Sequence, residues 1–120
     1  MSDIQFFDSN DQVPQPRDNV KIKGVQVELY PDRYRVWVNI KVVPFQERPN
    51  LLLVLRNLDG KIISELNIIE TMHADMEFTM HIRGGGDPAG EYELTVELFY
   101  DTRNPPHDRY TTTFTIPDAE

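Results

Sequence analysis

Cysteine is absent from the 120 residues of this chain. Its absence excludes disulfide bonds, thiolate metal sites and cysteine nucleophiles. Long apolar runs are missing as well, since the longest aliphatic stretch is LLLVL at residues 51–55, and a membrane-spanning helix needs about 20 apolar residues. The first residues are acidic where a secretory signal is basic, and no apolar stretch follows them. With Met1 as the native start, we therefore expect a cytoplasmic protein.

Positive charge is also scarce in this sequence. Twelve Lys and Arg stand against 20 Asp and Glu, which gives a formal net charge of −8. A chain of this sign is not attracted over long range to the phosphates of nucleic acid or to an anionic membrane surface. We therefore expect neither nucleic acid nor a membrane among its partners.

The length is that of one domain with one core. Residues 1–18 are polar, contain two prolines and show no sustained periodicity, so we expect a flexible N-terminal arm. Residues 19–120 then form a single domain. Phe6 and Phe7 are the exception in the arm, because an aromatic pair can dock onto the domain or onto a partner.

From residue 19 onward, apolar and polar residues alternate with a period of two. The alternation is clear at residues 33–43, 71–83, 91–100 and 109–116, and it predicts half-buried strands. Methionines take part in the apolar set of the second segment, so we expect them to fill the core: Met72, Met76 and Met80. The first strand changes phase at Gly24, which predicts a β-bulge.

The sequence NLDGK at residues 57–61 separates two apolar runs and predicts a β-hairpin. A two-residue turn at Asp59 and Gly60 pairs Leu58 with Lys61. The same register places six side chains on one face: Leu51, Leu53, Leu55, Ser64, Leu66 and Ile68. Residues 62–76 also fit helical spacing, but the isoleucines and the preceding turn favour a strand.

Together these patterns give seven short strands with turn signals about every ten residues, which resembles β-sandwiches of the immunoglobulin and fibronectin III type. The stretch DPAGEYELTVELFY is similar to the sixth strand of such domains. Gly90 opens that strand, the hydroxyl of Tyr92 is expected to bond back to the preceding corner, and Leu94 stands where antibody-type domains keep a cysteine. Bacterial immunoglobulin-like modules look similar, with packed aliphatics in place of the disulfide. The resemblance implies an all-β, seven-stranded antiparallel Greek-key β-sandwich, and this fold by itself implies no function.

Histidines and acids at residues 73–81 raise the question of a metal site. On one strand, His73 and His81 would stand about 26 Å apart, so they cannot share an ion. His73 with Asp75 or Glu77 would make only a weak site on an exposed strand. We expect Glu77 to approach Lys41 across the sheet instead, and we assign no metal and no cofactor.

Catalytic and phosphate-binding motifs are not apparent in this sequence. The run RGGGDPAGEY has the glycines of a phosphate loop but lacks the Lys-Ser/Thr that follows in a P-loop, so we interpret it as a turn. The serines, at positions 2, 9 and 64, have no activating context. We therefore assign no catalytic residue and expect a protein that is not an enzyme.

An apolar surface is predicted on the outside of the hairpin. The hairpin register directs Leu52, Val54 and Ile63 outward, and Phe99 faces the same side when the sheet order is that of a variable immunoglobulin domain. Contiguous apolar surface on a domain of this kind marks an interface. These four residues therefore predict contact with a protein partner, and a symmetric homodimer is the preferred form.

Ligand-binding candidates lie elsewhere in the chain. Trp37 projects outward between Arg35 and Asn39, as a platform for sugars or proline-rich peptides would. The alternative is that Arg35, Lys41 or His81 covers the indole. Loops at one end of the sandwich offer further candidates, because such loops are where rigid sandwiches bind: Phe45, Arg103 and His107.

Two functions follow from these candidates. The first is a non-enzymatic β-sandwich protein-interaction module that associates with itself. The alternative is a β-sandwich domain that binds a carbohydrate through Trp37, or that binds a carbohydrate or calcium through the loops, where acidic residues supply oxygen ligands.

Overall fold

The computed structural model describes residues 13–83 and 85–119. A short 3-10 helix, η1 (Arg17–Asn19), precedes the strands, and the described residues contain no α-helix. The strands are β1 (Ile22–Leu29), β2 (Arg35–Val42), β3 (Asn50–Asn57), β4 (Ile62–Ile68), β5 (Asp75–His81), β6 (Gly90–Phe99) and β7 (Asp108–Ile116). The helical alternative for residues 62–76 is wrong, and the strand prediction is confirmed at residues 62–68 and 75–76, with a connection between them. No helix in the described ranges is long and apolar enough to cross a membrane.

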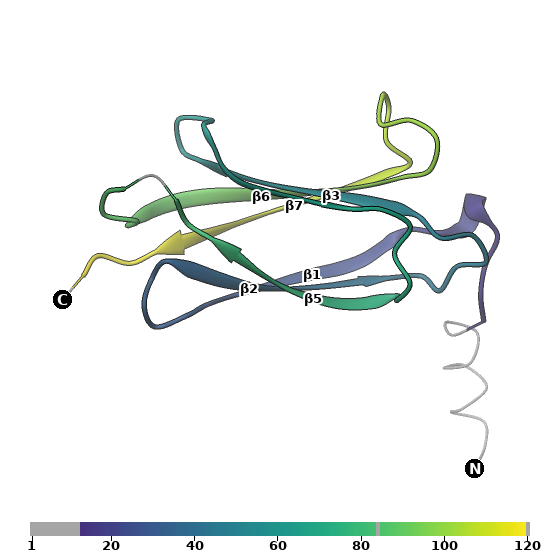
Figure 1. Cartoon of the computed structure of the whole chain (residues 1–120), viewed down its shortest axis with the longest axis horizontal. Helices are drawn as coiled ribbons and strands as arrows, with labels where there is room; N and C mark the ends of the chain where they lie inside the picture. Colours follow the sequence, from purple (N-terminus) through teal and green to yellow (C-terminus); the bar gives the residue numbers. More distant parts are fainter. Residues whose placement is uncertain (1–12, 84, 120) are drawn as a thin grey trace, which may run out of the picture.

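The strands form two antiparallel sheets stacked as two layers (Figure 1). One sheet has the order β1-β2-β5, and the other has the order β4-β3-β6-β7. The chain changes sheet between β2 and β3, between β4 and β5, and between β5 and β6. This arrangement confirms the predicted all-β sandwich of the immunoglobulin-like type.

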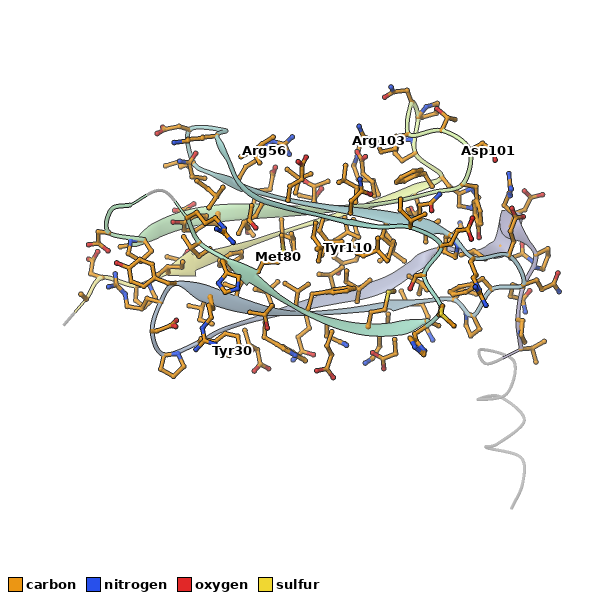
Figure 2. The ribbon with its side chains drawn as sticks, in the orientation of Figure 1. Tyr30, Arg56, Met80, Asp101, Arg103 and Tyr110 are labelled. Carbon is orange, nitrogen blue, oxygen red and sulfur yellow. The ribbon has the colours of Figure 1, made fainter. Side chains whose placement is uncertain are left out.

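The core lies between the two layers, where the apolar set of each strand meets that of the opposite sheet. Its central side chains are at most 1% exposed: Val36, Val38, Ile40, Leu51, Leu53, Leu55, Leu94, Val96 and Leu98. Met76 and Met80 are buried as predicted, and Figure 2 shows Met80 pointing between the layers. Met72 is 66% exposed, because it lies in the connection before β5 instead of in the strand. The prediction that Met72 fills the core is therefore wrong.

The corner before β6 is closed by Tyr92. Its hydroxyl donates a hydrogen bond of 2.7 Å to the carbonyl oxygen of Pro88. Gly90 has a φ of 139°, a conformation that glycine adopts without steric cost. Leu94 is 1% exposed in the core. These features confirm what the resemblance to immunoglobulin-like domains implies for this strand.

The β3–β4 hairpin keeps the predicted register but not the predicted turn. Leu51 lies opposite Ile68, as expected. The turn itself holds three residues, 58–60, because the amide of Asn57 donates to the carbonyl of Lys61 at 3.0 Å. The Asn57 side-chain oxygen also accepts the amides of Asp59 and Lys61, at 3.0 and 2.9 Å, which stabilises the longer loop.

Two bulges adjust the strands. In β1 the pairing shifts between Ile22 and Gly24, which confirms the predicted bulge. In the hairpin the pairing shifts between Leu55 and Arg56, so that Ile63 is the extra residue on β4. This second bulge compensates for the longer turn and restores the register. It also packs Ile63 against the core, so the predicted outward position of Ile63 is wrong.

Candidate functional site

At one end of the sandwich, the segment around η1 contacts the neighbouring loops of the domain. Arg17 donates to Asp101 at 2.8 Å and forms an ion pair with Glu47. Its guanidinium also lies 4.4 Å from the ring centre of Tyr100. The hydrogen bonds that Arg17 donates to Glu47 and Asp101 raise the pKa of Arg17 above its usual value. Residues 13–18 of the predicted arm are thus partly bound to the domain, whereas Phe6 and Phe7 lie outside the described residues.

The three loop candidates for ligand binding belong to this same end. A ring nitrogen of His107 lies 3.0 Å from the carbonyl oxygen of Val20. Arg103 contacts the Glu97 carboxylate at 3.4 Å, and Phe45 packs against the core. The structure uses all three side chains for internal contacts and does not bring them together with Trp37.

The histidines and acids at residues 73–81, to which we assign no metal, do not converge either. Among residues 13–83 and 85–119, no group of three His, Asp or Glu side chains is placed to hold a metal ion. Lys41 pairs with Asp75 at 3.2 Å, so the expected approach of Glu77 to Lys41 is wrong by two residues. Hydrogen bonds from Asn39, and then from Lys41, lower the pKa of Asp75.

The aliphatic residues on the outer face of the four-stranded sheet are buried. Leu52 and Val54 are each 6% exposed. Leu52 lies between Asn67 and Glu97 on the neighbouring strands. With Ile63 packed against the core, Phe99 is the remaining predicted interface residue, and it is half-buried. The described surface therefore holds no broad apolar patch at these four positions, and self-association stays a prediction.

The outer face of the three-stranded sheet has a different composition. Trp37 lies on its central strand, between Glu28 of β1 and Thr79 of β5, and its indole is half-buried. Around it on this face the side chains are polar or aromatic: Gln26, Glu28, Tyr30, Arg35, Asn39, Glu77, Thr79 and His81. An indole ringed by hydrogen-bonding groups is a typical recognition surface.

Hydrogen bonds hold the two aromatic rings of this face in place. The indole N–H of Trp37 donates to Glu77 at 3.1 Å. The hydroxyl of Tyr30 lies 3.1 Å from that of Thr79. Arg35 lies over the ring of Tyr30, at 4.2 Å from its centre. Arg35 therefore covers one face of the Tyr30 ring, and hydrogen bonds orient both aromatic side chains.

A hollow of about 330 Å³ lies beside the indole. Its walls are Glu28, Leu29, Tyr30, Pro31 and Trp37, and we call it the Trp37 hollow. Figure 2 shows Tyr30 on the side of this layer that faces away from the four-stranded sheet. The sequence identifies Trp37 but not the turn residues beside it. The sequence signal that could have identified them is the tyrosine and the proline that precede the strand of Trp37.

No protein-family model matches this chain, and no curated protein matches its sequence. Solved structures do resemble it. A β-glucuronidase from Bifidobacterium dentium is 15% identical with a TM-score of 0.55, over 82% of this chain and 18% of that one. A glycosyl hydrolase family 2 member from Bacteroides cellulosilyticus is 8% identical with a TM-score of 0.59, over 82% and 14%.

A β-glucuronidase from Lactobacillus rhamnosus is 19% identical with a TM-score of 0.51, over 81% of this chain and 16% of that one. The chain thus spans less than a fifth of the length of each of these enzymes. At such identities the likeness shows the fold alone. The chain is a β-sandwich module similar to one part of these larger proteins.

Proposed function

We propose that this chain is a non-enzymatic β-sandwich module that binds a neutral carbohydrate at the Trp37 hollow. The observation that carries the proposal is the fixed indole of Trp37, which lies beside the ring of Tyr30 within a polar sheet face. A sugar ring has an apolar C–H face that stacks on aromatic rings, and its hydroxyls need donors and acceptors around that contact. Glu28, Glu77 and Thr79 provide such groups next to the indole.

The charge of the site favours an uncharged ligand. Glu28 accepts a hydrogen bond from Gln26 at 3.0 Å, and Glu77 accepts one from the indole. Both donors are neutral, and no cation of residues 13–83 or 85–119 forms an ion pair with Glu28 or Glu77. A uronic acid or a sugar phosphate would be repelled there, whereas neutral hydroxyls can donate to the carboxylates.

The solved neighbours support sugars as the class to test. The B. dentium structure is that of a β-glucuronidase with coumarin-3-O-glucuronide. Because the likeness to this chain is one of fold, it does not name a ligand for the Trp37 hollow. The acidic surroundings of Trp37 favour a neutral sugar over a glucuronide.

Fluorescence titration tests the proposal directly, because Trp37 is the only tryptophan of the chain. We expect neutral gluco-, galacto- or manno-oligosaccharides to cause a saturable change in its emission, and calorimetry to give the same affinity. Trp37→Ala should lose binding in calorimetry while it keeps a cooperative thermal transition. Trp37→Phe should retain weaker binding, because a phenyl ring still offers a stacking face.

Phe99→Ala, on the opposite sheet, is the matched control and should bind as the wild type does. Failure of every neutral sugar to bind, or equal binding by Trp37→Ala, would overturn the proposal. Sedimentation velocity on the same samples measures self-association independently.

A further inference from the structure

A second hollow lies at the end of the sandwich opposite to η1. The β1–β2 turn, the β3–β4 hairpin and the β5–β6 loop meet there, on the left in Figure 1. The hollow measures about 170 Å³. Its walls include two cations from different connections, Lys61 after the hairpin turn and Arg83 after β5. We call it the Lys61–Arg83 hollow.

Two cations without an ionic partner among the described residues line this hollow. Six other basic side chains form ion pairs: Arg17, Arg33, Arg35, Lys41, Arg103 and Arg109. Lys61 and Arg83 are exposed, and neither forms an ion pair with a described residue. Lys21, Arg48 and Arg56 form no ion pair with a described residue either, but only Lys61 and Arg83 line the hollow, where their positive charge favours an external anion.

The carboxylate in the wall does not cancel this charge. Asp87 pairs with Arg33 at 2.7 Å and accepts the amide of Ala89 at 3.0 Å. These contacts, the amide first, lower the pKa of Asp87 and engage its charge on the side of Arg33. Lys61 and Arg83 therefore remain available to a ligand.

Neutral donors complete the wall. Gly85 and Gly86 line the hollow, and within the described part of the chain their amides donate to no acceptor. A Cβ built at either glycine would meet nothing within 4 Å, so the approach to their backbone is open. Asn57, on the hairpin, also lines the hollow. Backbone amides together with cations are the groups that hold phosphate and carboxylate oxygens in proteins.

We propose that the Lys61–Arg83 hollow binds a small oxyanion, a phosphate or carboxylate group, between the ammonium of Lys61 and the guanidinium of Arg83. A volume of about 170 Å³ admits one such group. The β5–β6 connection, which the sequence predicts to be a turn, supplies one wall of the site through Gly85 and Gly86. The site is separate from the Trp37 hollow and shares none of its walls.

Amide NMR of the full chain, titrated with inorganic phosphate and separately with acetate at constant ionic strength, tests this site. We expect saturable shifts of the Asn57, Gly85 and Gly86 amides. Lys61→Ala and Arg83→Ala should each weaken the binding about tenfold, as expected for the loss of a charged hydrogen bond. The double variant should show no saturable binding.

Lys21→Ala/Arg48→Ala is the matched control, because it removes two exposed cations from outside this hollow and should leave the titration unchanged. Lys61→Arg should retain most of the affinity. Tighter binding of phosphate than of acetate identifies a phosphoryl group as the ligand, and the reverse order identifies a carboxylate. Absence of saturable shifts with both anions, or equal losses in the control and the Lys61/Arg83 double variant, would overturn the site.

Discussion

The central apolar residues on the outer faces of the two sheets differ in how far they are exposed. On the four-stranded sheet, Leu52 is 6% exposed and lies between the cross-strand neighbours Asn67 and Glu97. On the three-stranded sheet, Trp37 is larger than its neighbours Glu28 and Thr79, and it stays half-exposed beside a hollow. The exposure of an outward side chain thus depends on the size of its cross-strand neighbours as well as on its face.

Substitutions in β3 should show the largest effect, because this strand has both kinds of position. Leu53→Ala leaves a cavity between the sheets and should lower the free energy of unfolding by about 2 to 5 kcal/mol. Leu52→Ala removes a side chain that only its neighbours cover, so about 1 to 2 kcal/mol is expected. Urea denaturation measures both. Equal losses would show that Leu52 is as much a core residue as Leu53.

Sugar binding should separate the two outer faces next. Trp37→Ala should weaken binding of a neutral oligosaccharide at least about tenfold, the loss expected when a stacking contact of this kind disappears. Leu52→Ala should leave the affinity unchanged in the same calorimetric titration. Loss of binding in Leu52→Ala, with binding unchanged in Trp37→Ala, would place the ligand on the four-stranded sheet and contradict the proposal.

Glu97 provides a smaller test of how Leu52 is covered. Glu97 pairs with Arg103 at 3.4 Å and with Arg109 at 2.8 Å. Glu97→Ala removes both pairs and should cost about 1 kcal/mol in thermal or urea unfolding. It also uncovers Leu52, so we expect stronger concentration dependence in sedimentation velocity than for the wild type. Unchanged sedimentation would indicate that Leu52 is covered by other groups.

Lowering the pH should produce the smallest of these effects, a change in thermal stability. Asn39 and Lys41 lower the pKa of Asp75, and the amide of Tyr34, followed by Arg35, lowers the pKa of Asp32. A lowered folded-state pKa stabilises the fold above the usual value of 3.8, and that contribution disappears as pH falls below it. Asp32→Asn/Asp75→Asn should therefore flatten the dependence of the thermal midpoint on pH in this range. An unchanged slope would rule out a contribution from these carboxylates.

Sequence periodicity predicts the features that depend on one strand and its nearest turn. The alternation around Trp37 gives the correct face, and the motif at Gly90 and Tyr92 gives the corner hydrogen bond. The pairing of Lys41 with Asp75 is missed by two residues, because register between β2 and β5 is set by strands far apart in sequence. Exposure of Leu52 is missed for a related reason, since it depends on side chains of two other strands.

The residues of the candidate site divide in the same way, into those that one strand predicts and those that depend on the pairing of strands. Trp37 is identified from its own strand, whereas Leu29, Tyr30 and Pro31 become its neighbours only when β1 pairs with β2. The hairpin turn is missed because the side chain of Asn57 accepts two loop amides, which alternation does not record. Ile63 then faces the core as a consequence of that turn.

Because of the bulge at Ile63, the length of the hairpin loop does not determine the register of the core residues. The extra loop residue is absorbed at the bulge, and Leu51 still meets Ile68. A change of one residue in this loop therefore need not propagate to the buried layer. The β3–β4 hairpin is a place where the chain can accept insertions, such as a peptide tag or a spectroscopic probe, without a change in the sheet that carries Trp37.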